Sequence, residues 1–203
     1  SIVVSLDQSF ESVANQVGVM NGREFATYIN EITPGTFNNI DILPDTDWQD
    51  LIFQDFAPIT NANLSASGAT DQARYYLGLG YFGQGGIIPK SGLDRLTAKI
   101  NSGYDLTKNV RFGLDLSIAL TDKDNAPGVV NTALRAWPVN SPFNEDGTFA
   151  EVEGSNPLAT IEYTNSKTQS LLGLGNLYAE VDFLEHFRFK TSAQFDFGTS
   201  RSK

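Results

Sequence analysis

The chain has 203 residues, no Cys, a single His and a net charge of −10, because 24 acidic side chains stand against 14 basic ones. This acidic balance argues against a nucleic-acid-binding protein, which needs basic side chains to meet phosphates. The lack of Cys excludes disulfides, thiol nucleophiles and thiolate metal sites. No apolar run approaches the roughly 18 residues that a membrane-spanning helix requires, but membrane-spanning strands, which are only half apolar, stay possible.

Both ends of the sequence resemble cut points. The chain opens SIVVSLDQSF, with no initiator Met and no signal-peptide pattern, and it stops directly after a strand-like segment. We therefore interpret it as an internal or processed piece of a longer protein.

The first part of the chain combines a strand with a long loop region. Residues 1–10 alternate weakly and predict a first barrel strand or a junction before the barrel, and residues 11–58 form the loop region. Within it, MNGREFATYINE predicts a short helix over residues 21–31, because Asn21 and Glu24 have the spacing of a capping box. A shorter helical turn is possible in DTDWQDLIF, where Asp45 or Thr46 would be the cap.

Period-2 alternation dominates the rest of the chain. Residues 59–121 hold four predicted strands, at 59–68, 75–83, 96–106 and 110–121. A second long loop covers 122–167, and the region 168–199 holds strands at 171–183 and 187–197, which makes seven strands in all. The side chains that we expect on the apolar, lipid-facing side include Phe112, Leu114, Leu116, Ile118, Leu120, Phe189 and Phe195.

The connections between the strands alternate strictly between short turns and long loops. Outer-membrane barrels have this asymmetry, with short periplasmic turns and long extracellular loops. Five predicted strands also reach the about 9 to 11 residues that a membrane-crossing strand needs. Aromatic residues gather near strand ends: Tyr75, Tyr104, Phe183 and Phe187 beside the short turns, and Tyr81, Phe195 and Phe197 toward the opposite rim.

These features predict an all-β fold, an antiparallel up-and-down segment of a transmembrane β-barrel. A secreted or surface β-sandwich that binds glycans is the alternative, because sandwich strands alternate as well. Expression of the chain in detergent and in water would separate the two.

The sequence favours no catalytic, cofactor or metal site. The acidic stretches NEDG (residues 144–147) and LTDKDNAPG (residues 120–128) lack the ligand spacing of an EF-hand, and NEDG reads better as a turn. The carboxylate pairs Glu151/Glu153 and Asp45/Asp47 are more typical of solvated loops than of an acid and a base. We therefore expect a protein that is not an enzyme.

The long loops hold the remaining candidates. Trp48, Trp137 and Phe143 could contact a ligand or a partner protein, since aromatic side chains offer a large contact area at low entropic cost. Equally, the two tryptophans could pack the loops onto the barrel rim or onto one another. The first loop is also strongly acidic: residues 31–55 hold six acidic side chains and no Lys or Arg.

Several segments, in order along the chain, resemble the start of the barrel in SusC/RagA-type TonB-dependent outer-membrane transporters of Bacteroidota. They are TDWQDLIF (46–53), NLSASG (63–68), YYLGLGYFGQGGI (75–87) and RLTAKIN (95–101), with SFESVANQVGVMNGREFATYIN (9–30) before them and NPLA (156–159) after them. The sequence departs from the family pattern at Ala66 and Ala69, where Val and Gly are commoner.

The resemblance implies a place in a barrel of about 22 strands, of which these residues would be the first third. It implies import of oligosaccharides or peptides together with a SusD-like surface lipoprotein, and coupling to TonB through a plug that this segment lacks. The implied surroundings are the outer-membrane lipids of a Gram-negative, Bacteroidota-like cell and the remainder of the protein's own barrel, with no nucleic acid.

Overall fold

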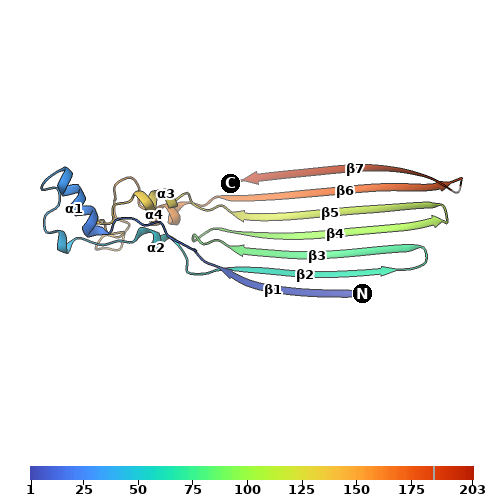
Figure 1. Ribbon diagram of the computed structural model, residues 1–203, viewed down its shortest axis with the longest axis horizontal. Helices are drawn as coiled ribbons and strands as arrows, with labels where there is room; N and C mark the ends of the chain where they lie inside the picture. Colours follow the sequence, from blue (N-terminus) through green and yellow to red (C-terminus); the bar gives the residue numbers. More distant parts are fainter. Residues whose placement is uncertain (185) are drawn as a thin grey trace.

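Seven long strands, hydrogen-bonded in chain order, form one antiparallel sheet (Figure 1). The computed structural model describes residues 1–184 and 186–203. The strands are β1 (Ile2–Glu11), β2 (Ala57–Ala69), β3 (Ala73–Gly85), β4 (Gly92–Thr107), β5 (Val110–Asp124), β6 (Lys167–Phe183) and β7 (Phe187–Ser202). The prediction of seven antiparallel strands is confirmed. All of them belong to a single sheet, whereas the alternative of a sandwich requires two packed sheets.

Most strands are longer than the alternation predicted. β5 continues to Asp124 rather than 121, and β6 begins at Lys167 rather than 171. The added residues are mostly polar on both faces, so they break the alternating pattern without breaking the ladder of backbone hydrogen bonds. Lys167 and Asp124, which lie opposite each other, add an ion pair of 2.9 Å.

This lengthening changes the expected position of two aromatic side chains. β7 runs on to Ser202, so Phe195 and Phe197 lie in the middle of the strand and not at its rim. At the other end of the sheet the expected aromatic gathering is present: Tyr104 lies opposite Phe112, and the Phe183 and Phe187 rings stack at 5.8 Å.

The helices all lie beyond one end of the sheet, in two of the long connections (Figure 1). The β1–β2 connection contains α1 (Gly22–Ile32), the short 3-10 helix η1 (Ile40–Ile42) and α2 (Trp48–Ile52), and the β5–β6 connection contains α3 (Val130–Arg135) and α4 (Pro157–Tyr163). No helix in the described part of the chain is long and apolar enough to cross a membrane.

The predicted capping box of α1 is present. The Glu24 backbone N–H donates to Asn21 Oδ1 at 2.9 Å, and the Asn21 N–H donates to Glu24 Oε2 at 3.1 Å. The cap of α2 is Asp47, which accepts from the N–H groups of Gln49 and Asp50, so the expectation of Asp45 or Thr46 at this cap is wrong. Asp45 instead accepts a hydrogen bond from the Gly22 N–H at 2.7 Å.

The helices α3 and α4 were not predicted. With six and seven residues they complete fewer than two turns, too few to show a period of 3.6. A local signal existed for α4 alone, because Asn156 caps it and Pro157 occupies its first turn.

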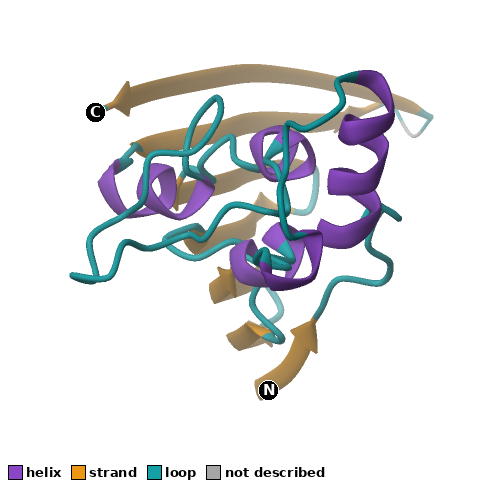
Figure 2. Cartoon of the chain, turned by 90° about the vertical axis from the view of Figure 1, so that its left-hand side faces the viewer, coloured by secondary structure: helices purple, strands orange, loops and turns teal. Residues whose placement is uncertain are grey.

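Three long connections fold together into one body that covers the end of the sheet (Figure 2). We call it the loop lobe and define it as residues 12–56, 86–91 and 125–166. Its core joins side chains of all three segments, namely Trp48, Ile52, Ile88, Val129, Ala133, Ala136 and Ile161. The loop lobe thus has a buried core of its own, whereas the sheet has none on either face.

Candidate functional site

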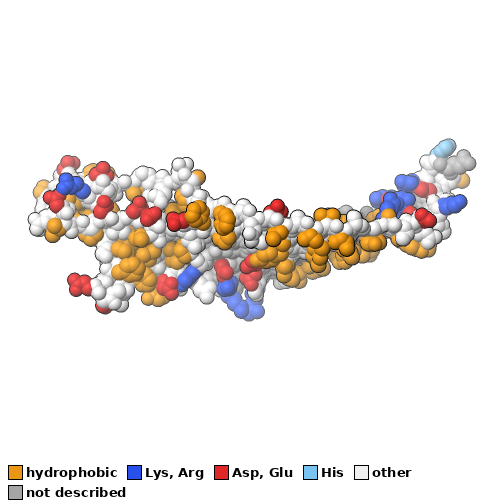
Figure 3. Space-filling model, turned by 90° about the horizontal axis from the view of Figure 1, so that it is seen from below, with side chains coloured by type: hydrophobic (Ala, Val, Ile, Leu, Met, Phe, Trp, Pro, Cys, Tyr) orange, Lys and Arg blue, Asp and Glu red, His pale blue; other side chains and the backbone are white. Residues whose placement is uncertain are grey.

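The two faces of the sheet differ sharply in chemistry. Side chains directly opposite in neighbouring strands share a face, and along one such row Ile100, Leu116 and Phe195 are joined across Gly175. All seven side chains predicted to face lipid lie on this apolar face by the strand register. Many hydrophobic side chains of the sheet are exposed, with 59% exposure at both Leu79 and Phe189. Figure 3 shows hydrophobic side chains gathered along the part of the molecule that the strands occupy.

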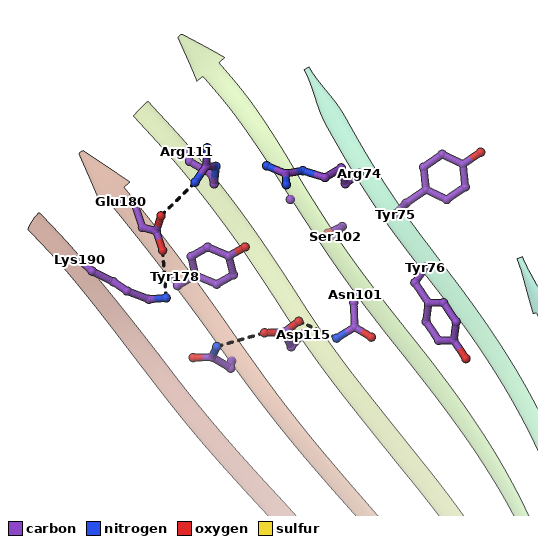
Figure 4. A pocket seen from close by; sticks show the side chains of 12 residues that line it. Arg74, Tyr75, Tyr76, Asn101, Ser102, Arg111, Asp115, Tyr178, Glu180 and Lys190 are labelled. Carbon is purple, nitrogen blue, oxygen red and sulfur yellow. Dashed lines mark hydrogen bonds and ion pairs between the residues drawn. The ribbon is translucent and has the colours of Figure 1, made fainter. Parts of the chain in front are cut away.

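The opposite, polar face carries a row of alternating charges near the short turns. Arg111 lies at its centre, with Nε 2.6 Å from Asp105 Oδ1 and Nη1 3.2 Å from Glu180 Oε2. Arg74 extends the row at 3.7 Å from Asp105, and Lys190 extends it at 2.9 Å from Glu180. Five strands, β3 to β7, therefore contribute one charged side chain each to a nearly neutral row. Figure 4 shows Arg74, Arg111, Glu180 and Lys190 of this row.

A second polar cluster lies closer to the middle of the same face. Asp115 accepts hydrogen bonds from Asn101 Nδ2 at 2.6 Å and from Asn176 Nδ2 at 3.3 Å. Together with the charged row, this cluster borders an open hollow of about 530 Å³ (Figure 4). The hollow presents paired charges and amides to water or to a polar surface. The described residues contain no group of three or more His, Cys, Asp or Glu side chains that could hold a metal ion.

Sequence reasoning missed the pairing in these two clusters. The strand register places Asp105, Asp115 and Glu180 on the polar face, but the sequence does not indicate which cation or amide each of them meets. The partner depends on the strand register, and a shift of one residue would place each carboxylate on the opposite face.

Of the three aromatic candidates in the loops, Trp48 is the most deeply buried. It is 3% exposed, belongs to the core of the loop lobe and donates from Nε1 to the Trp137 carbonyl at 3.0 Å. Burial leaves it little surface for a ligand, which agrees with the alternative that the tryptophans pack the loops.

Trp137 and Phe143 are more accessible than Trp48, and their rings pack against different aromatic side chains. The Trp137 ring is 5.3 Å from Phe25 and 6.2 Å from Phe37, so within the lobe it joins the β5–β6 connection to α1 and to the segment after α1. Phe143 is 44% exposed and packs at 5.4 Å against Phe149, its partner in an isolated β-bridge. The structure does not bring the three candidates together in one site, and a contact of Phe143 with a partner stays a prediction.

The loop lobe carries almost all of the net charge. It contains twelve acidic and three basic side chains, a net charge of −9, whereas the whole chain carries −10. Several of the acids hold the loops together. Asp146, for example, accepts hydrogen bonds from the Thr148 hydroxyl and the Thr148 backbone N–H, which lower the pKa of its carboxyl below the ordinary value.

Comparison with known proteins shows which proteins the chain is similar to. The chain is 28% identical over 212 residues to TonB-dependent receptor P3 of Formosa agariphila, in a match that covers 96% of the chain and 21% of that receptor. It is 30% identical over 170 residues to TonB-dependent receptor P26 of the same organism, covering 81% of the chain and 17% of the receptor. TonB-dependent receptor SusC of Bacteroides thetaiotaomicron matches at 24% identity over 88% of the chain.

The chain is a SusC/RagA-like segment, similar to one part of these TonB-dependent receptors. The solved RagAB peptide importer in its closed-closed state superposes on this SusC/RagA-like segment with a TM-score of 0.81 and 16% identity, covering 99% of the segment and 28% of that chain. Its open-open state gives 0.80. No protein-family profile matches the sequence.

The segment spans about a fifth of the length of these curated relatives. The relatives described here are named as receptors and the solved neighbours as a transporter or importer, and none of them is named as an enzyme.

Proposed function

We propose that this SusC/RagA-like segment forms part of the wall of a TonB-dependent barrel in the outer membrane of a Gram-negative, Bacteroidota-like cell. The apolar face of the sheet meets the lipid, the polar face lines the lumen, and the loop lobe stands on the outside of the cell. The complete barrel has about 22 strands, as the resemblance implies, and imports oligosaccharides or peptides.

The observation that carries this proposal is the sheet itself. β2 to β7 have 13 to 17 residues, enough to cross a bilayer at a tilt, and one face exposes large apolar side chains while the other carries paired charges. In water, the apolar face of a single sheet of this kind stays exposed to solvent unless another layer covers it. In a membrane both faces find a matching medium.

The two free edges of the sheet support the same proposal. β1 and β7 each have a neighbour on one side alone within the described residues. In lipid an unpaired row of N–H and C=O groups would cost several kcal/mol per group, in the range of about 2–7. We therefore propose that further strands of the same barrel pair with both edges.

The proposed partners follow from the resemblance. A SusD-like surface lipoprotein would meet the loop lobe from outside, and TonB would act from the periplasm through a plug that lies outside this segment. The solved RagAB neighbour is a peptide importer, which supports a peptide as one of the two proposed substrate classes.

Single cysteines test the proposed topology, because this segment has no Cys of its own. In the receptor that contains it, Ile42→Cys in the loop lobe should react with a membrane-impermeant maleimide on intact cells, since Ile42 is 79% exposed. Lys108→Cys, in the turn between β4 and β5, should react only after the outer membrane is opened.

Two neighbouring positions on β5 supply the matched pair for the faces. Leu116→Cys should resist the aqueous reagent but react with a lipid-soluble one, and Ser117→Cys should react once water reaches the lumen. Labelling of Lys108→Cys on intact cells, or equal aqueous labelling of Leu116→Cys and Ser117→Cys, would refute the proposed orientation.

A further inference from the structure

A cleft of about 350 Å³ lies inside the loop lobe, away from the sheet. It is lined mostly by apolar side chains of the segment before α1 and of α1, α2 and α3, among them Met20, Phe25, Trp48 and Leu134. A volume of this size with an apolar lining and a few polar groups is typical of small-ligand sites. Arg135, the last residue of α3, contributes the only charged side chain of the lining.

The walls of this cleft are held in place by hydrogen bonds. The Gln49 side chain, which is 5% exposed, accepts from the Val17 N–H at 3.0 Å and donates to the Val17 carbonyl at 2.7 Å. On the other side the Thr46 N–H donates to the Pro138 carbonyl at 2.8 Å. The cleft is therefore formed before a ligand arrives, which lowers the entropic cost of binding.

Arg135 differs from the other cations of the lobe. Arg23 is ion-paired with Asp41, and Lys90 with Glu162 at 2.7 Å. Arg135 has no ion pair among the residues that the structure describes, although the lobe carries a net charge of −9. The acids nearest to the cleft in sequence, Asp45 and Asp47, accept hydrogen bonds from backbone N–H groups instead.

The backbone beside the cleft also has free hydrogen-bonding groups. Gln49 holds Val17, but in the described part of the chain the N–H and C=O groups of residues 18–20 take part in no hydrogen bond. They could pair with an extended peptide backbone or with sugar hydroxyls.

We propose that this cleft binds a ligand that carries a carboxylate next to an apolar group. The carboxylate would pair with the Arg135 guanidinium, and the apolar group would rest on Phe25 and Met20. The C-terminus of a peptide and an acidic sugar both supply this chemistry. The site is argued from the lobe alone, so it holds or fails separately from the proposed barrel topology.

Isothermal titration calorimetry on the intact receptor in detergent tests the site with two matched pairs of probes. One pair is N-acetyl-Phe-Leu with a free carboxylate and its C-terminal amide; the other is 4-nitrophenyl β-glucuronide and 4-nitrophenyl β-glucoside. We expect at least one acid to bind about 10- to 100-fold more tightly than its neutral counterpart, the range of a charge-assisted hydrogen bond. The pair that discriminates identifies the source of the carboxylate.

Variants decide whether Arg135 is responsible. Arg135→Gln should remove the preference for the acid and leave binding of the neutral probe unchanged, and Arg135→Lys should keep part of it. Arg23→Gln, which removes an ion-paired cation of α1, serves as the matched control and should keep the full preference. The proposal is overturned if neither acid binds more tightly than its neutral partner, or if Arg135→Gln keeps the preference.

Discussion

At the scale of single residues, several aromatic rings of the sheet lie over a glycine in the neighbouring strand. The pairs are Tyr75 over Gly68, Tyr178 over Gly113, Phe197 over Gly173 and Phe195 over Gly175, each directly opposite in register. A glycine in a strand leaves room for a ring to lie flat against the backbone. A Cβ at Gly113 would lie 2.0 Å from Cζ of Tyr178, so the ring and an added methyl group could not occupy the same space.

We predict that Gly113→Ala destabilises the protein by about 1–3 kcal/mol, the usual cost of overpacking. The Tyr178 ring would have to move, and its contact with the Lys190 ammonium, 4.8 Å from the ring centre, would be lost. The unfolding free energy in urea measures the effect. Gly103→Ala is the matched control, because Gly103 lies opposite Gly113 and a Cβ there stays 3.5 Å from the nearest atom. Equal effects of both substitutions would contradict the prediction.

At the scale of the element, each strand separates two media through the alternation of its side chains. β5 shows this most clearly: Phe112 to Leu120 are apolar at every even position, and the odd positions carry Arg111, Asp115 and Ser117. The turn lengths and the register keep all seven strands in phase, so the alternation of each strand adds to the same two faces.

We predict that Leu116→Arg costs about 2–4 kcal/mol of stability in a lipid bilayer, because Leu116 lies near the middle of β5 on the apolar face. Ser117→Arg should cost less. Its new charge would lie opposite Lys99, and this pairing of like charges should destabilise the protein by about 0.2–1 kcal/mol. Reversible unfolding from lipid vesicles compares the two variants, and a Ser117→Arg cost equal to that of Leu116→Arg would argue against a lipid-facing side.

At the scale of the whole molecule, a charged lobe with its own core stands on the end of a nearly neutral sheet. The lobe core centres on buried Trp48 and Ile52, while no comparable core covers the sheet. Because the two parts share few buried contacts, the lobe should lose its structure without unfolding the strands.

Trp48→Ala tests this separation. We predict a loss of about 3–5 kcal/mol confined to the loop lobe, the usual cost of removing a buried tryptophan. Hydrogen exchange should show lobe amides losing protection while the amides of β3 to β6 keep theirs. Phe143→Ala, an exposed aromatic of the same lobe, is the control and should have little effect. Loss of protection across the strands would contradict the separation.

The sequence predicted the features that depend on neighbours along the chain. The seven strands, the apolar positions from Phe112 to Leu120 and the Asn21–Glu24 capping box all follow from periodicity or short spacing. The two short helices of the second long connection escaped prediction, because fewer than two turns carry no readable period. Strand ends such as Asp122 to Asp124 resembled a loop, because they are polar on both faces and so break the alternation.

Long, two-faced antiparallel strands and acidic loops could therefore be predicted for this protein, because a local pattern of side chains repeats at the period of a strand. The groupings of residues that are distant along the chain could not be predicted in this way. Folding joins Arg111 to Glu180, places Trp48 and Ile161 in one buried core and places Arg135 and Met20 in the lining of one cleft. These contacts depend on strand register and on the packing of three separate loops, which no periodicity within a single segment encodes.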